Sequence, residues 1–553
     1  MTISLMLPLV GKTQTDLKRV DKGTGPLSFT PATTATRLNP DTNLIESVAS
    51  GDLREDGRQY LNRLYYSEDF SQANWAKSSV TVASDNAAAP NGKAVAQSLT
   101  AAAANGTCLQ AVTDVSRVRY GSIYLKRKTG TGTIQVTLDG GSTWTTVAVT
   151  SEWVRLGATQ PLANPSFGIR IVASGDAVYA WGAQLEDAAA ATRYKKSGSS
   201  PAYSPQGVLI EGQRTNVVLW SEALDDAVWV KGNVTITANA TTDPMGTTTA
   251  DKIVETAVNN NHYVAQVCTK AASALDYVFS VYLKAVERTK ARIQIEDGAG
   301  NGMYALVDLS VGTIEAATLL GTGFTTLTDG IDIAPNGYYR AWIHAVTNTA
   351  TSINSFVYLR DDTGASSYLG DVTKGLYAFG HQLEQAAFPS SYIPTTSAAV
   401  TRNADTLSVP SSGNMVTLSP FTIVSTVDVL GNLNGNQQVV GSDVNYAGYA
   451  LIQTNGIRSS LYNNAGDALG LVMEVPAEYG QSIKRGWRFD GTNQDVFRKG
   501  VNGTAGGRGT PVTEISTVYI GSHAAIQHLY GHIKNLMIFN RALTDAEMIA
   551  ITG

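Results

Sequence analysis

An eight-residue segment occurs twice in this chain, and this repetition constrains the fold more than any other feature of the sequence. Residues 179–186 read YAWGAQLE, and residues 377–384 read YAFGHQLE. In both copies aromatic and leucine residues alternate with small or polar ones, which is the period of a half-buried strand. A match of this length between two distant segments indicates an internal duplication.

The residues upstream of each copy match as well. Residues 64–70 (LYYSEDF) correspond to residues 218–224 (VLWSEAL), and SIYLK at 122–126 corresponds to SVYLK at 280–284. The second copy is longer, and we expect its inserted residues to add strands. Two copies are too few for a solenoid, so each copy is predicted to be a domain with its own core. We place these domains at residues 61–197 and 206–397, with a linker rich in Ser, Gly and Pro at residues 195–205.

The composition indicates β structure throughout. Only 16% of the 553 residues are charged, while Val, Ile, Tyr, Thr, Ser, Gly and Asn favour short strands joined by tight turns. We therefore predict an all-β chain of tandem antiparallel β-sandwiches, with a jelly roll in each repeat and a third sandwich at residues 398–553. Residues 1–60 show no clear periodicity and are predicted to be an extended arm that becomes ordered against a partner, with a disordered tail as the alternative.

Charge and hydropathy exclude several functions. A net charge of -5 gives no electrostatic basis for binding nucleic acid or an anionic membrane. No apolar run approaches the roughly 20 residues needed to span a bilayer. Pro8 interrupts the apolar residues 3–10, and no basic residue precedes them, so we expect no secretory signal peptide. Cys108 and Cys268 do not occupy equivalent repeat positions, and we expect two buried free thiols.

Several segments resemble known families. Residues 535–547 (NLMIFNRALTDAE), in which Thr544 and Glu547 are spaced as a capping box, resemble the closing strand and helix of concanavalin A-like (laminin G-like) sandwiches. The two repeats resemble the carbohydrate-binding-module-like jelly rolls of bacteriophage tail and other virion proteins. Those proteins contain Tyr-Ser-Glu-x-Phe, Ser-x-Tyr-Leu-Lys and Trp-Gly-x-Gln-Leu-Glu at corresponding places.

The resemblance implies a structural protein of a bacteriophage virion, in a tail fibre, tail tip or head fibre. The N-terminal arm would attach the chain to other virion proteins, and the sandwiches would bind host-surface glycans. Fibres of this class are commonly threefold, so we expect a homotrimer. A bacterial adhesin is an alternative, which the expected lack of a signal peptide argues against.

No catalytic residues are predicted. The Glu-x-Asp-x-x-Glu strand typical of concanavalin A-like glucanases is absent from the sequence, and so are a Gly-x-Ser-x-Gly elbow and a phosphate loop. We therefore expect a protein that is not an enzyme and needs no cofactor. The alternative is a polysaccharide depolymerase or glucanase that uses the third domain.

No metal site is predicted either. The acidic segments 296–298 and 361–364 could hold a structural Ca²⁺ through oxygen ligands, although ordinary turns are the favoured interpretation. His523, His528 and His532 are not spaced to share one face of a strand, and we expect them in a solvated loop. Glu186 and Glu384 end the duplicated segments. We interpret them as structural clamps on a neighbouring Arg or on the backbone.

Glycan binding requires exposed aromatic rings with amide or carboxylate groups beside them. Aromatic residues at matched repeat positions are assigned to the core, which leaves unmatched loop residues for binding. The candidate glycan-binding residues are Trp144, Asp443, Asn445, Tyr446 and Tyr449. The core assignments are Trp75 with Trp229, and Trp181 with Phe379.

Overall fold

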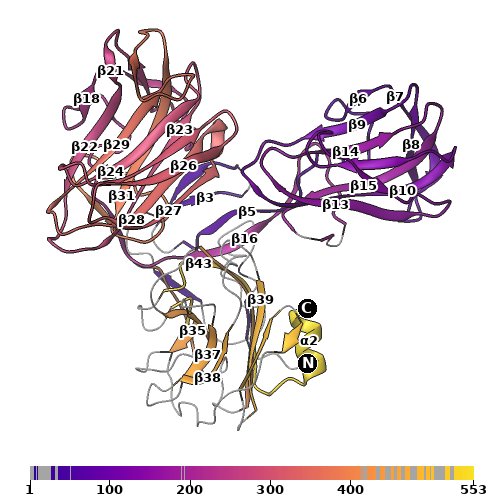
Figure 1. Cartoon of the computed structure of the whole chain (residues 1–553). Helices are drawn as coiled ribbons and strands as arrows, with labels where there is room; N and C mark the ends of the chain where they lie inside the picture. Colours follow the sequence, from indigo (N-terminus) through magenta and orange to yellow (C-terminus); the bar gives the residue numbers. More distant parts are fainter. Residues whose placement is uncertain are drawn as a thin grey trace.

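The computed structural model shows three β lobes joined at a common centre (Figure 1). It describes residues 5–7, 9, 27–30, 35–40, 42–49, 52–188, 190–191, 194–412, 414, 420–430, 436–442, 450–453, 458–462, 468–473, 483–490, 494–498, 500–502, 517–522 and 528–553. All the strand pairs of these residues are antiparallel. The prediction of tandem antiparallel β-sandwiches is therefore confirmed.

The first repeat is a sandwich of two five-stranded sheets. One sheet has the order β13 (Val154–Leu162), β10 (Arg117–Thr129), β15 (Ala177–Glu186), β8 (Ala94–Ala101) and β7 (Val80–Ala88). The other has the order β12 (Thr145–Val147), β11 (Ile134–Thr137), β14 (Ser166–Ile171), β9 (Gly106–Ala111) and β6 (Ala76–Ser78). Their inner faces enclose one cluster of buried apolar side chains that includes Trp75, Phe167 and Leu185.

The second repeat has the same strand order with two strands added by the insertion. One sheet runs β18 (Val230–Gly232), β22 (Tyr263–Thr269), β29 (Ser352–Arg360), β24 (Lys290–Glu296), β25 (Gly302–Asp308) and β26 (Thr313–Leu320). The other runs β19 (Val234–Thr241), β20 (Ala250–Glu255), β31 (Gly375–Glu384), β23 (Asp276–Lys284), β28 (Tyr339–Val346) and β27 (Thr325–Ile333). A two-stranded sheet pairs β21 (Asn259–Asn261) with β30 (Ser367–Leu369), and the 3-10 helix η1 spans Pro335–Gly337.

The duplicated segments form central strands, β15 and β31, in equivalent sheets. Each contains a β-bulge beside a glycine, Gly182 or Gly380, with φ of 63°. Only glycine adopts that conformation without strain, and a Cβ on Gly380 would come within 2.9 Å of the Tyr282 ring. The assignment of Trp75, Trp229, Trp181 and Phe379 to the core is confirmed, because all four side chains are buried.

The third sandwich is completed by strands from other parts of the chain. Its first sheet runs β41 (Val501–Asn502), β40 (Gln494–Arg498), β39 (Ile483–Phe489), β34 (Phe421–Val429), β43 (Gly531–Phe539), β16 (Ala202–Ile210) and β5 (Glu55–Asn62), with β1 (Leu5–Leu7) also paired to β43. Its second runs β2 (Ser28–Thr30), β33 (Thr406–Pro410), β42 (Thr517–Ile520), β35 (Asn436–Ser442), β36 (Ala450–Gln453), β37 (Arg458–Tyr462) and β38 (Ala468–Met473). The described strands of the N-terminal segment thus pair within this chain.

Short elements complete the description. The two-stranded sheets pair β3 (Ala35–Leu38) with β4 (Ile45–Val48) and β17 (Arg214–Asn216) with β32 (Val400–Arg402). The helix α2 (Asp545–Thr552) begins with the capping box expected from the sequence, since Thr544 and Glu547 cap each other's backbone. Within the described ranges, no helix combines the length and apolarity needed to cross a membrane.

A buried ionic cluster lies where the lobes meet, and we call Arg54, Glu211, Arg402 and Asp405 the hub. Arg54 donates to Glu211 Oε2 over 2.7 Å and also to Asp405, while Arg402 donates to Glu211 and to Gly212 O over 2.9 Å. All four side chains are at most 1% exposed. The hub joins the N-terminal segment, the residue after β16 and the start of the third domain, so it fixes these segments to one another.

The second repeat is tied to the hub as well. Ser391 donates its backbone N–H and its hydroxyl to Glu211, over 2.9 and 2.7 Å. Burial alone would raise the pKa of Glu211, but Arg402 and Arg54 hold that pKa well below its usual range. Two cations and two carboxylates thus balance in a site that excludes water. An uncompensated charge in such a site is costly.

Candidate functional site

The sequence-predicted glycan residues fall into two groups. Asp443, Asn445, Tyr446 and Tyr449 lie outside the described residues. Trp144 follows the Asp139–Gly140–Gly141 turn and precedes β12, and it is only partly buried.

The indole of Trp144 packs against Arg170 on the outward face of the first repeat. Its ring lies 4.4 Å from the Arg170 guanidinium carbon. Gln135 Oε1 accepts from Arg170 Nε over 2.8 Å and also from Nη2. Gly141 adjoins the indole, since a Cβ there would come within 2.9 Å of the ring. The Arg170 guanidinium and the Trp144 indole thus share this face.

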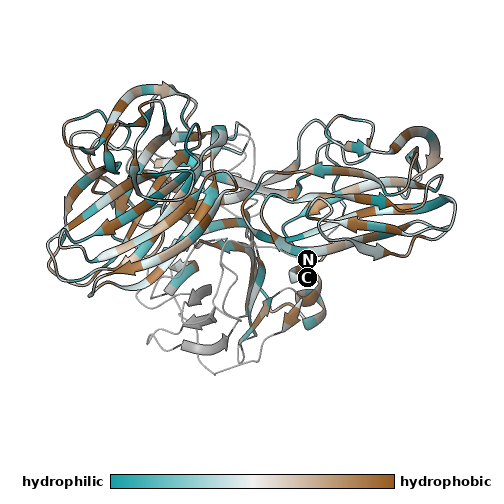
Figure 2. Ribbon diagram, turned by 45° about the horizontal axis from the view of Figure 1, so that its top comes forward, coloured by the Kyte–Doolittle hydropathy of each residue, from teal (hydrophilic) through white to brown (hydrophobic). Residues whose placement is uncertain are grey.

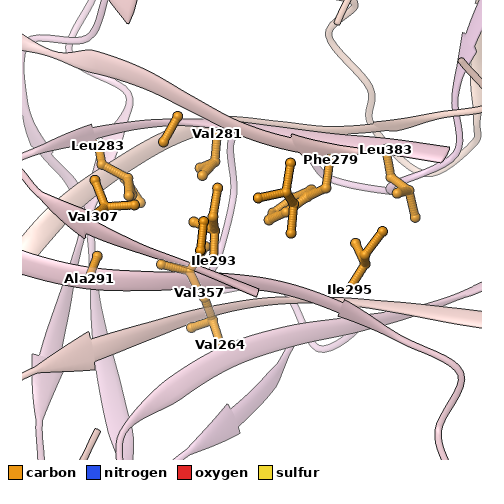
Figure 3. Close-up of a cluster of buried hydrophobic side chains, with 14 of the residues drawn as sticks. Val264, Phe279, Val281, Leu283, Ala291, Ile293, Ile295, Val307, Val357 and Leu383 are labelled. Carbon is orange, nitrogen blue, oxygen red and sulfur yellow. The ribbon is translucent and has the colours of Figure 1, made fainter. Parts of the chain in front are cut away.

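The second repeat has a larger set of aromatic side chains on its outward face. Along β22, β29 and β24, Val264, Val357 and Ile293 point into the core (Figure 3). Because side chains alternate along a strand, their neighbours point to the opposite face. Those neighbours include Tyr263 and Tyr358.

We call Tyr263, Tyr304, Phe356 and Tyr358 the aromatic face. The strand register brings them together, since Tyr358 pairs with Tyr263 across one ladder and with Arg292 across the next. The Phe356 and Tyr358 rings are stacked with centroids 5.5 Å apart, and Tyr263 lies 5.6 and 5.1 Å from them. Tyr263, Tyr304 and Phe356 are half-buried, so part of each ring is open to solvent.

A row of polar side chains on β24 runs through this aromatic face. Arg292 lies between Tyr304 and Tyr358, with its guanidinium carbon 4.1 and 5.0 Å from the two ring centroids. Arg292 donates to Gln294, and Gln294 Nε2 donates to Glu296 Oε2 over 2.8 Å. The row therefore has one positive and one negative end.

Two atoms beside the rings lack partners. Arg292 Nε and Asn354 Oδ1 are buried and make no hydrogen bond within the described part of the chain. A buried polar atom without a partner costs free energy, so a side-chain shift that brought either atom to a ligand hydroxyl would be favourable. Burial also raises the pKa of Glu296 and lowers the pKa of Arg292. The site therefore offers donors, acceptors and ring faces together.

Sequence reasoning overlooked the aromatic face because it considered only loop aromatics that have no counterpart in the other repeat. A usable signal is present in Phe356 and Tyr358, which stand two residues apart on a strand and so share one side. The pattern alone does not distinguish a core face from an outward one. The distinction comes from the alternate residues, such as Val357, which are buried.

The duplicated glutamates act as clamps, as expected. Glu384 accepts from Ser390 N over 2.8 Å and from the Ser390 hydroxyl over 2.7 Å. Arg155 lies 3.8 Å from Glu186 in the first repeat. Both carboxylates are buried at the end of a central strand, where they hold the following segment.

The acidic loops bind protein donors. Both side-chain oxygens of Asp297 accept hydrogen bonds, Oδ1 from Asn301 N over 3.1 Å and Oδ2 from the Asn348 amide over 2.7 Å. Asp361 Oδ1 accepts from Thr363 N over 3.0 Å. Among the described residues, no group of three or more His, Cys, Asp or Glu is arranged to hold a metal ion.

The prediction of a solvated histidine loop is wrong for the two described histidines. His528 and His532 are 7% and 2% exposed, and His523 lies outside the described residues. His532 sits between Asp56 and Asp428, with nitrogen–oxygen distances of 3.1 and 3.3 Å. Burial would lower the pKa of His532, but these two carboxylates raise it to about 9. The sequence gives no local signal for this contact because Asp56 is so distant along the chain.

Comparisons with known proteins give only remote similarities. No protein-family model matches the chain, and no curated protein matches it. Among solved structures it is similar to the N-terminal CBM22-1–CBM22-2 tandem of Paenibacillus barcinonensis Xyn10C, at 12% identity and a TM-score of 0.20 over 60% of this chain and 99% of that one. It is also similar to Trypanosoma rangeli sialidase, at 10% identity and a TM-score of 0.21 over 94% and 96% of the two chains.

A glycoside hydrolase family 32 structure from Bifidobacterium adolescentis is similar at 10% identity and a TM-score of 0.13, over 79% of this chain and 99% of that one. The presence of this hydrolase and the sialidase among the matches contradicts the expectation that the chain is not an enzyme, and we withdraw that expectation. At these TM-scores the matches carry no argument about individual residues. The function is therefore inferred from the side chains of this chain.

Proposed function

We propose that this chain is a glycan-binding protein and that the aromatic face of the second repeat holds the sugar. The observation that carries the proposal is the combination of half-open rings with the polar row Arg292–Gln294–Glu296 on one sheet face. Sugar rings present C–H groups that pack on aromatic faces, and their hydroxyls need paired donors and acceptors. Both kinds of contact are available within this one set of neighbouring strands.

The arrangement suits a sugar lying flat on the sheet. The half-buried Tyr263, Tyr304 and Phe356 rings would pack against pyranose C–H groups, while the buried Tyr358, stacked on Phe356 at an interplanar angle of 15°, would hold the Phe356 ring in place. Arg292 Nε would donate to a hydroxyl oxygen, and Asn354 Oδ1 would accept a hydroxyl proton. Both atoms are buried in the free protein, so binding would require a shift of the side chains that cover them, while the strands that carry them stay in place.

The resemblance seen in the sequence supports a location on a bacteriophage virion, with the aromatic face directed at glycans of the host surface. In that setting the N-terminal segment would contact other virion proteins, and a homotrimer would present three copies of the face. Linked sites raise avidity by about 10²–10⁴ without new contacts. Labelling purified particles with an antibody against the third domain tests the location.

The binding experiment uses a glycan array followed by calorimetry on the full chain. Replacing Phe356 and Tyr304 by Ala removes two anchors, and losing one good anchor costs on the order of 2 kcal/mol, or about 30-fold in Kd. Tyr377→Ala is the matched control, because Tyr377 is also half-buried but lies on β31 of the other sheet. Unchanged affinity in F356A and Y304A would refute the proposal.

Catalysis is followed in the same experiment. Bound glycan is incubated with the full chain and assayed for new reducing ends, because hydrolases are among the structural matches. Release that disappears in Glu296→Gln would identify the aromatic face as a cleavage site. Release that persists in this variant would place cleavage elsewhere in the chain.

A further inference from the structure

The two repeats differ in the charge of their outward faces, and this difference predicts what each face selects. In the second repeat Arg292 is linked to Glu296 through Gln294, so the face is balanced. In the first repeat Arg170 has no carboxylate within ion-pairing distance in the described part of the chain. Its partners are Gln135 and Trp144, and both are neutral.

The guanidinium of Arg170 is held with one edge open. Gln135 Oε1 accepts from Nε and Nη2, which fixes the plane of the group and occupies one edge. Nη1 makes no hydrogen bond within the described residues and is not buried. Each terminal nitrogen carries two N–H groups, so the edge formed by Nη1 and Nη2 retains two parallel donors.

Neighbouring residues hold this geometry. Trp144 covers one face of the guanidinium at 4.4 Å, and Gln135 is itself held by a 3.2 Å hydrogen bond from its Nε2 to Thr146 Oγ1. The nearest acidic residue in sequence to Trp144 is Asp139, whose carboxylate is engaged by Thr137 and Thr143 over 2.8 and 2.9 Å. Asp139 pairs with Ser166 on β14, four residues before Arg170 along that strand.

We propose that Arg170 is a carboxylate-binding residue for an acidic sugar, with Trp144 and Gln135 as positioning residues. A planar guanidinium with two parallel donors matches a carboxylate in a bidentate pair. The pyranose ring of the same sugar would extend over the sheet toward the exposed Thr146. This inference rests on the proposed glycan-binding function. It adds that the first repeat selects a uronate-type unit while the second repeat takes an uncharged one.

The experiment measures binding of the full chain to three polymers: polygalacturonate, dextran sulfate and an uncharged glucan. Wild-type protein should bind polygalacturonate and lose most of that binding in Arg170→Gln, which keeps a polar side chain but removes the charge. Arg170→Lys keeps the charge but loses the bidentate fork, so it should restore less than half of the loss. Trp144→Ala should weaken binding less than Arg170→Gln, because it only frees the guanidinium to move.

The controls separate this inference from the proposed function. Arg127→Gln alters another half-buried arginine of the first repeat, which pairs with Asp176 at 3.4 Å, and it should leave polygalacturonate binding unchanged. Equal loss in R127Q and R170Q, or stronger binding of dextran sulfate than of polygalacturonate, overturns the inference. Binding of the uncharged glucan without binding of polygalacturonate overturns it and leaves the proposed function standing. Binding of none of the polymers counts against both.

Discussion

Removing the Arg54 side chain should loosen the junction of the three lobes. Arg54 is fully buried and bonds to Glu211, Asp405, Ser391 and Thr36 O, with the last two contacts at 3.1 and 3.3 Å. Arg54→Ala would leave two buried carboxylates facing Arg402 alone. Breaking a buried ion pair from one side costs about 3–5 kcal/mol. We therefore expect the junction to open about 10²–10⁴ times more often.

Hydrogen exchange is the appropriate assay, because unfolding of a multidomain chain is not a two-state process. The informative amides are Glu211 N, which donates to Asp405 over 2.8 Å, and Ser391 N, which donates to Glu211 over 2.9 Å. Peptides that contain these amides should exchange faster in Arg54→Ala. Peptides from β29, in the core of the second repeat, should exchange at the wild-type rate.

Arg117→Ala provides the matched control for this experiment. Arg117 also forms an ion pair between lobes, with Asp332 at 3.7 Å, but the two side chains are 42% and 57% exposed. Exposed pairs contribute about 0–1 kcal/mol, so exchange should barely change. If Arg54→Ala exchanges no faster than Arg117→Ala at the hub, burial is not what makes these charges important.

Four further predictions concern separate parts of the chain. The pKa of His532 is raised to about 9 from an ordinary value near 6.5, so the contribution of His532 to folding stability should be complete below about pH 6.5. That contribution should be lost as the pH rises through 9, by up to about 3 kcal/mol. Thermal melts of wild type and His532→Gln should therefore converge at high pH, and a constant gap between them would contradict this prediction. Cys108 and Cys268 are buried, and burial raises the pKa of each thiol to about 12. Neither should react with a thiol reagent at pH 8 before the protein unfolds, and rapid labelling of the native protein would contradict this prediction. Thr544→Ala should destabilise the C-terminal helix by about 1 kcal/mol, measured by exchange of its amides, while Thr544→Ser should restore protection. Light scattering should show a trimer at micromolar concentration, and a monomer there would refute the oligomer prediction.

The repeated architecture could be read from the sequence because its determinants occur at matching positions in both copies. Asn62 and Asn216 occupy matching places, and the amide of each donates to a backbone carbonyl of its duplicated strand over 2.9 and 3.0 Å, to Ala183 O and His381 O respectively. Trp75 and Trp229 each donate to a backbone carbonyl nine residues earlier, both over 3.1 Å. Contacts of this kind occur in both copies, so the two copies can be matched from the sequence.

The junction could not be predicted because it depends on distant segments. Nothing close in sequence links Arg54, Glu211 and Asp405, which meet only when β5, β16 and β33 take their places in the fold (Figure 1). Part of the expected linker at 195–205 lies in β16, which pairs with both β5 and β43. A polar composition predicted a loop there, but residues 202–205 pair with β5 and are part of a strand.

The aromatic face was equally hard to predict. Brown and teal residues alternate along the strands in Figure 2, so hydropathy marks two faces without showing which one is covered. Tyr358 is 9% exposed and counts as buried, although it belongs to the outward face. Its neighbours Tyr263 and Phe356 cover it, and that contact depends on the pairing of β22 with β29. Only the three-dimensional register reveals the set.

Residue-level carbene footprinting of the full chain, with and without its glycan, tests the central claim most directly. If the aromatic face holds the sugar, Tyr263, Tyr304 and Phe356 should lose labelling when the glycan is present, while Tyr377 on the opposite sheet keeps its labelling. Masking confined to the third domain, with Tyr263, Tyr304 and Phe356 labelled as in the free protein, would contradict the account.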